Sequence, residues 1–158
     1  MGLLRAFVGF SSTDIRYYHL MKAWKENENI DFDFTDCQLS DEINSEDEDY
    51  IKRKCRARIN MAGKYIILIG DDTNSKHKYV RWEAEVAIEK GCAIIGCNLD
   101  GARQMVDSKC PTIIKNIGSI FVPFSPYIIK HALENYSMHD SGNYYYKPEV
   151  YKQLGYDR

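Results

Sequence analysis

Residues 65–69 read YIILI, and the turn that follows them, residues 70–74, reads GDDTN. A run that is apolar on both faces is typical of a central strand in a parallel sheet, because helices cover both faces of such a sheet. The turn is rich in Gly, Asp and Asn, which favour the end of regular structure. This stretch therefore predicts an α/β domain with a buried parallel sheet.

Strand and helix patterns alternate on both sides of this run, which is expected to be the third of five strands. The second strand, residues 30–35 (IDFDFT), alternates apolar and acidic residues, so we expect it at an edge with one face in water. Pro123 cannot donate a backbone hydrogen bond, so the fifth strand is expected at or near an edge. The remaining expected bounds are residues 5–10 for the first strand, 93–99 for the fourth and 119–124 for the fifth.

Helical patterns fill the gaps between these strands. The helix after the first strand is expected to bury the stripe Tyr17, Leu20, Met21 and Trp24. A helix over residues 76–90, ending at Gly91, is expected to face the sheet with Val80, Ala84, Ala87 and Ile88. Another helix is expected over residues 126–136, with Pro126 in its first turn.

Together these elements predict a flavodoxin-like, doubly wound parallel sheet with the strand order 2-1-3-4-5. We expect residues 1–136 to form this domain and the tyrosine-rich extension, residues 137–158, to pack on the same domain. In this order the switch point lies between strands 1 and 3. Ligands are therefore expected at loops 10–14 and 70–74, which follow those strands.

The composition excludes several classes of function. With 158 residues, of which 44% are hydrophobic and 28% charged, the chain is expected to be one soluble domain. No apolar run reaches the ~20 residues that span a bilayer. The net charge of −2 gives no reason to expect nucleic acid or a membrane surface as a partner. Five cysteines without a Cys-x-x-Cys pair, and no signal-peptide pattern, favour reduced thiols in a cytoplasmic protein.

The two switch-point loops lack common nucleotide-binding and metal-binding patterns. No GxGxxG follows the first strand, and the loop 70–74 lacks GxxxxGK followed by Ser or Thr. Asp14, Asp36 and Asp71 are similar to the acidic pocket of a phosphoacceptor receiver, but the lysine that a receiver needs is missing. The four histidines are scattered, so no metal site is expected.

The start of the helix 76–90 concentrates aromatic and acidic residues. Tyr79 and Glu83 share a face at i, i+4, and Glu83 is expected beside the stripe that packs on the sheet, near the switch point. Acidic residues are also common in the first turns of helices, because they interact favourably with the helix dipole. This pattern alone therefore leaves a purely structural role for Glu83 open.

Several short blocks resemble a known family. The first strand and its loop, residues 7–14 (FVGFSSTD), resemble the opening of a Toll/interleukin-1 receptor (TIR) domain. Residues 79–83 (YVRWE), 87–91 (AIEKG) and 94–96 (IIG) resemble the motif of the third helix, and of the strand after it, in TIR-like proteins of bacteria and archaea. These proteins include the NAD-consuming signalling subunit of Thoeris antiphage systems. The resemblance covers roughly residues 4–136 in element order.

Two features of the chain depart from that family. Gly9 stands where many TIR domains have serine. The loop after the second strand lacks the usual arginine and proline-glycine features, through which such domains assemble, so no oligomeric state is predicted.

The resemblance implies an NAD glycohydrolase of the ADP-ribosyl cyclase type. In that family a helix glutamate cleaves the bond between nicotinamide and ribose; the matching residue here is Glu83, and Glu85 is the runner-up. The implied products are nicotinamide and one ADP-ribose product, which is ADP-ribose itself, a cyclic isomer or a conjugate. This second product would be a signal in antiphage defence that a downstream effector senses. NAD is then the substrate, and no cofactor is expected.

One carboxylate is chemically sufficient for this reaction, because nicotinamide leaves as a neutral molecule and the ribosyl centre that remains is cationic. Phe10 and Trp82 are candidates to offer ring faces to a base, and Ser11, Ser12 and Asp36 to hold ribose hydroxyls or phosphates. Backbone amides of the loop after the first strand suit a phosphate still better. The alternative is a non-enzymatic TIR-like module that binds a protein partner or a nucleotide without turnover.

Overall fold

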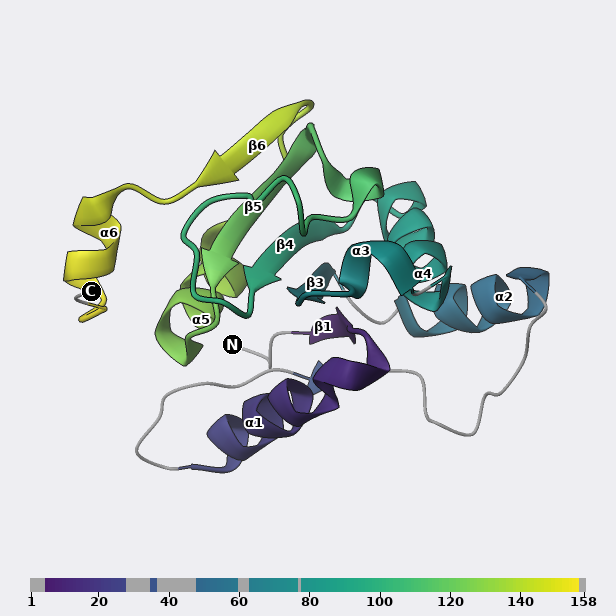
Figure 1. Cartoon of the computed structure of the whole chain (residues 1–158), viewed down its shortest axis with the longest axis horizontal. Helices are drawn as coiled ribbons and strands as arrows, with labels where there is room; N and C mark the ends of the chain where they lie inside the picture. Colours follow the sequence, from purple (N-terminus) through teal and green to yellow (C-terminus); the bar gives the residue numbers. More distant parts are fainter. Residues whose placement is uncertain (1–4, 28–34, 37–47, 60–62, 77, 157–158) are drawn as a thin grey trace.

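The computed structural model describes residues 5–27, 35–36, 48–59, 63–76 and 78–156. In this part of the chain, a single sheet of six parallel strands lies between two groups of helices (Figure 1). The strands are arranged in the order β2-β1-β3-β4-β5-β6. They are β1 (Arg5–Gly9), β2 (Thr35–Asp36), β3 (Lys64–Ile69), β4 (Ala93–Asn98), β5 (Ile117–Pro123) and β6 (Gly142–Tyr145).

The sheet has one strand more than the sequence predicted. The predicted order 2-1-3-4-5 corresponds to β2-β1-β3-β4-β5, and β6 is added beside β5. Of the second predicted strand, only the end lies within the described residues, and it pairs with β1 through Arg5–Thr35 and Ala6–Asp36. The switch point between β1 and β3 is therefore flanked by the strands on which the candidate site was expected.

Two hydrophobic cores lie on opposite faces of the sheet, because successive side chains of each strand alternate between the faces. Helices α1 (Ile15–Glu26) and α5 (Pro126–Asn135) cover the face that includes Val8 and Leu68. Helices α2 (Glu48–Ile59) and α4 (Lys78–Glu89) cover the face that includes Phe7, Tyr65 and Ile67. The shorter elements are α3 (Thr73–Lys76), α6 (Pro148–Gln153) and the 3-10 turns Ser12–Asp14 and Thr112–Ile114.

Two predicted helix stripes are corrected in part. In α1, Met21 is buried as expected, but Leu20 is 46% exposed and Tyr18 is buried instead. The buried stripe is thus rotated toward Tyr18, which stacks on Phe10. In α4, Ile88 is 39% exposed.

The burial of α4 is broader than one stripe, since Trp82 and Val86 are buried together with Val80, Ala84 and Ala87. The cause is that α2 packs against α4, so that α4 is covered by a helix as well as by the sheet. The helix predicted over residues 76–90 corresponds to α4 and the last residue of α3, with residue 77 outside the described residues. Helix α4 ends at Glu89, two residues before Gly91, whose positive φ of 72° favours glycine.

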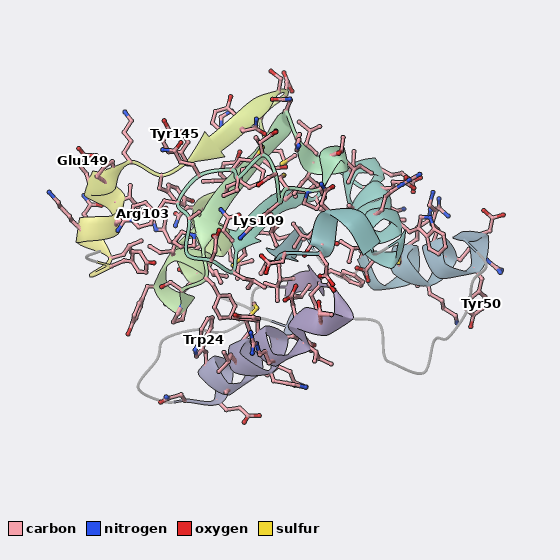
Figure 2. The ribbon with its side chains drawn as sticks, viewed as in Figure 1. Trp24, Tyr50, Arg103, Lys109, Tyr145 and Glu149 are labelled. Atoms are coloured by element: carbon pink, nitrogen blue, oxygen red, sulfur yellow. The ribbon has the colours of Figure 1, made fainter. Side chains whose placement is uncertain are left out.

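The tyrosine-rich extension, residues 137–158 and below called the tail, contributes the strand β6 and the helix α6. Strand β6 pairs with residues Ile117 to Phe121 of β5, so β5 is the second strand from the edge of the sheet. Pro123 lies beyond the stretch of β5 that pairs with β6. The ring of Tyr151, on α6, is 1% exposed and belongs to the core beneath α1 and α5. Arg103, in the loop after β4, lies 4.2 Å from the centroid of this ring (Figure 2). Within the described ranges, no helix is long and apolar enough to cross a membrane.

Candidate active site

The side chain of Glu83 lies inside the protein at the carboxyl end of β1. It is 4% exposed, although it sits in the first half of α4 where a surface position would be ordinary for a glutamate. A Cβ atom added to Gly9, the last residue of β1, would lie 2.9 Å from Glu83 Oε1. The carboxyl group is therefore packed against the backbone at the switch point, on the face of the sheet that α2 and α4 cover.

Tyr65, on β3, is the hydrogen-bond partner of Glu83 among the described residues. Its hydroxyl lies 3.5 Å from Glu83 Oε1 and 3.5 Å from the carbonyl oxygen of Val80. Both distances are at the long limit for a hydrogen bond, and the single hydroxyl proton can point to either acceptor. The parallel register places Tyr65 beside Phe7, two residues before Gly9. The long tyrosine side chain thereby reaches the space that glycine leaves open.

Burial dominates the electrostatics of this site. It raises the pKa of Glu83 to about 8, while the hydrogen bond from Tyr65 lowers that pKa in part. Burial, followed by the charge of Glu83, likewise raises the pKa of Tyr65 and that of Cys55 on α2. These three side chains, the acid cluster, are weak acids that all favour their neutral forms. At neutral pH the site without substrate therefore holds a protonated glutamic acid.

Glu85 has a different environment, although it is only two residues from Glu83. It forms ion pairs with Lys52 of α2 and, at 3.3 Å, with Arg81 of α4. The hydrogen bond with Lys52 is the main cause that lowers the pKa of Glu85. Glu85 thus joins α2 to α4 near the surface and is fully ionised at neutral pH.

The loops after β1 and β3 are fastened to one another. The Thr13 hydroxyl donates to the Asp72 carboxylate at 2.9 Å and is 2.8 Å from the hydroxyl of Ser11. Since the Thr13 proton goes to Asp72, Ser11 donates to Thr13, and Ser11 Oγ also accepts the Thr13 amide at 3.3 Å. Ser11, fully buried, therefore shapes the loop after β1.

A third loop, the one after β4, is tied to the same edge of the sheet. Lys109 lies in this loop (Figure 2). Its ammonium group is 3.2 Å from Asp71 and 3.2 Å from Asp100. Asp14 lies against Gly70, where a Cβ atom would be 2.8 Å from the Asp14 carboxyl carbon. The carboxyl ends of three neighbouring strands are thus held by polar contacts. No group of three His, Cys, Asp or Glu side chains that could hold a metal ion occurs in the described part of the chain.

The structure distributes the other predicted binding residues over both faces of the sheet. Phe10 is half-buried and stacks on Tyr18 at 4.8 Å between ring centroids, on the side of α1 and α5. Trp82 is 6% exposed and packs on the side of α2 and α4. Ser12 begins a 3-10 turn and Asp36 ends β2, while their side chains, like that of Tyr79, lie outside the described residues. Phe10 is therefore not brought to the face that holds Glu83.

Sequence reasoning missed the part that Tyr65 and Gly9 have in this site. Tyr65 was assigned only to a buried strand, and Gly9 only to a departure from a family pattern. The available signal was a tyrosine in the first positions of a strand whose expected neighbour, residues 5–10, has a glycine at its second-last position. A hydroxyl in an apolar strand needs a polar partner, and a glycine in a strand often marks a close approach.

Two solved structures are similar to this chain at low sequence identity. CMP N-glycosidase BcmB of Clostridium botulinum is 14% identical, with 96% of this chain and 95% of that chain covered and a TM-score of 0.42. A conserved protein from Enterococcus faecalis V583 is 14% identical, with 97% and 86% covered and a TM-score of 0.44. No curated protein sequence matches the chain.

A sequence family gives a more specific result. The family model described as Thoeris protein ThsB, TIR-like domain, matches residues 7–104, which is more than half of the chain and runs from β1 to the loop after β4. The matched region contains Gly9, Tyr65 and Glu83. The resemblance noted in the sequence is thereby confirmed, and the chain belongs to the family of TIR-like domains of the Thoeris protein ThsB.

Proposed function

We propose that this protein cleaves NAD between nicotinamide and ribose, with Glu83 as the catalytic carboxylate. The observation that carries the proposal is the burial of this carboxyl group, 4% exposed, at the end of β1 beside the switch point. Carboxyl groups whose pKa is strongly raised by burial cluster at catalytic sites, because catalytic acids and bases need pKa values matched to their reaction. Membership of the ThsB TIR-like family supports the same assignment.

The proposed reaction needs the ionised form of Glu83. The bond between ribose C1′ and the pyridinium nitrogen breaks, and its electron pair leaves with nicotinamide, which becomes neutral. The carboxylate stabilises the cationic ribosyl centre until water attacks it and loses a proton, which yields ADP-ribose. An internal nucleophile of the same molecule would yield a cyclic product. The positive charge of the bound pyridinium lowers the pKa of Glu83 from its free value of about 8, so binding favours the active form.

The binding residues and the biological role belong to the same proposal. We expect backbone amides of the loop after β1, with Ser12 and Asp36, to contact the phosphates and ribose hydroxyls. Ser11, Phe10 and Trp82 are engaged by the protein itself, so we expect them to shape the site. The product would act as a signal in antiphage defence for a downstream effector.

The test is nicotinamide release from NAD by the purified protein and by the protein in lysate of phage-challenged cells. Glu83→Gln should lower the rate at least about 100-fold, as expected for loss of a charge that stabilises a transition state. Glu85→Gln is the matched control and should keep wild-type activity, since Glu85 is held by Lys52 and Arg81. Equal activity of Glu83→Gln and wild type would contradict the assignment. Binding of NAD by the wild type without release in either preparation would favour the non-enzymatic module.

A second candidate function follows from the protonation of Glu83. Because burial raises its pKa to about 8, Glu83 carries a proton at neutral pH and could act as a general acid. It would then protonate the departing base of an uncharged N-nucleoside or N-nucleotide as the glycosidic bond breaks, and would itself become a carboxylate. The two functions predict opposite pH profiles, because one requires the carboxylate and the other the acid.

A further inference from the structure

We propose that Tyr65 is a positioning residue for Glu83, and that Gly9 is required because it leaves room for the Tyr65 hydroxyl. The catalytic consequence rests on the proposed function, whereas the contact itself can be tested without it. Tyr65 is expected to act through the carboxyl group of Glu83 and not to contact the substrate itself.

The ring of Tyr65 has a fixed place in the core. It is fully buried and lies 5.9 Å from the ring of Phe7 between centroids. A phenylalanine would fill the same apolar space without bringing a hydroxyl that must be desolvated. Among the described residues, the hydroxyl has two hydrogen-bond acceptors, Glu83 Oε1 and the carbonyl oxygen of Val80, both at 3.5 Å.

The hydroxyl has one proton and two acceptors, so its donation depends on the charge of Glu83. When Glu83 is ionised, donation to the carboxylate is the stronger choice, because hydrogen bonds to charged groups are the strong ones. When Glu83 is protonated, the carboxyl can donate to the phenol oxygen while the phenol donates to Val80. In both states Tyr65 orients the carboxyl group, and it favours the ionised state.

Gly9 is needed for space and has an ordinary backbone conformation. It is not among the residues with positive φ. A Cβ atom at this position would overlap the Tyr65 hydroxyl, lie 2.8 Å from the ring carbon that carries it and 2.9 Å from Glu83 Oε1. Any larger residue must therefore displace Tyr65, Glu83 or both.

Among the described residues, few titratable groups lie near Glu83 and could change its pKa. Tyr65 comes from β3, Cys55 from α2, and Gly9 on β1 has no titratable group. Cys55 stays a neutral thiol, since burial raises its pKa. Loss of the Tyr65 hydroxyl should therefore raise the pKa of Glu83, because it removes the hydrogen bond that lowers it.

The experiment follows the carbon-13 signal of the Glu83 carboxyl group as a function of pH, assigned with Glu83→Gln. In Tyr65→Phe the titration should shift to higher pH. Tyr151→Phe is the matched control: it also removes a hydroxyl from a buried tyrosine, but on the opposite face of the sheet, and should leave the titration unchanged. An unchanged titration in folded Tyr65→Phe would overturn the proposal.

Kinetics then separate this proposal from the proposed function. Tyr65→Phe should lower kcat at neutral pH about tenfold or more, the loss expected for a hydrogen bond to a charged group, with little change in KM. If the titration shifts in Tyr65→Phe but the wild type does not cleave NAD, the positioning role stands and the proposed function is removed. A loss of kcat without a shifted titration would overturn the positioning role.

Two further variants keep the proposal testable if Tyr65→Phe does not fold. Fluorotyrosine at position 65 keeps the volume and strengthens the donor, so the titration should shift to lower pH. Gly9→Ala should shift it to higher pH by displacing the hydroxyl. Where Tyr65→Phe does fold, the double variant Gly9→Ala with Tyr65→Phe should shift the titration little beyond either single variant, because both substitutions remove the same contact. Additive shifts, or no shift with fluorotyrosine, would contradict the proposal.

Discussion

The pH dependence of activity is decided by one residue, because burial raises the pKa of Glu83 to about 8. If the carboxylate is the active form, kcat/KM for NAD should rise with pH through this value and level off above it. The rise of kcat with pH should occur at a lower pH than the rise of kcat/KM, because the bound pyridinium favours ionisation of Glu83. Rates measured between pH 6 and pH 9 test this, with Glu83→Gln as a flat, low control. A decrease of kcat/KM above this pKa would favour the general-acid function instead.

The same residue should make the folded protein less stable as pH rises. The pKa of Glu83 is about 8 when folded, against 4.5 as the ordinary value, so the folded state binds more protons between these values. Stability attributable to Glu83 is therefore present below the ordinary value and is lost as pH rises to the folded value, with a cost of roughly 3 kcal/mol at pH 7. Thermal unfolding should show Glu83→Gln more stable than wild type at pH 8 and similar to it at pH 4.5. If the difference in stability between Glu83→Gln and wild type were the same at pH 4.5 and pH 8, the raised pKa of Glu83 in the folded protein would be contradicted.

At the scale of elements, the contact between α2 and α4 is what encloses Glu83. Lys52 and Arg56 of α2 pair with Glu85 and Glu89 of α4, and Arg56 reaches Glu89 at 2.8 Å. These pairs lie at the surface, so each should add little to stability. Glu85→Gln should lower the free energy of unfolding by less than about 1 kcal/mol in urea denaturation. A much larger loss would mean that the pair, and not the apolar contacts around Cys55 and Ile59, holds the two helices together.

The elements were predictable from the sequence where one local pattern defines them. The apolar run at residues 65–69 defines a buried strand, and the spacing of Val80, Ala84 and Ala87 defines a helix face; β3 and α4 lie at these positions. The contact between Tyr65 and Glu83 was not predictable, because it depends on the register that sets Tyr65 beside Phe7. The exposure of Ile88 likewise depends on how α2 lies over α4, which no pattern within α4 encodes.

At the scale of the whole molecule, the tail contributes the sixth strand of the sheet. Strand β6 lies beside β5 at the edge of the sheet (Figure 1). Tyr151, on α6, is buried in the core. The predicted tail therefore closes both an open strand edge and a hydrophobic surface, each of which favours aggregation when exposed. We accordingly expect residues 137–158 to unfold together with the rest of the domain.

Paired substitutions within the tail test this expectation. Tyr151 is 1% exposed and Tyr145 is 51% exposed, so they differ in burial but not in residue type. Tyr151→Ala should cost about 3–5 kcal/mol and lower the single unfolding midpoint by roughly 10 °C, as for other large core residues. Tyr145→Ala should change the midpoint little, as for a surface substitution. If Tyr151→Ala instead produced a separate early transition and left the main midpoint unchanged, the tail would be an independent unit docked on a domain that ends before it, and Glu83 would then keep its raised pKa in a chain truncated after residue 136.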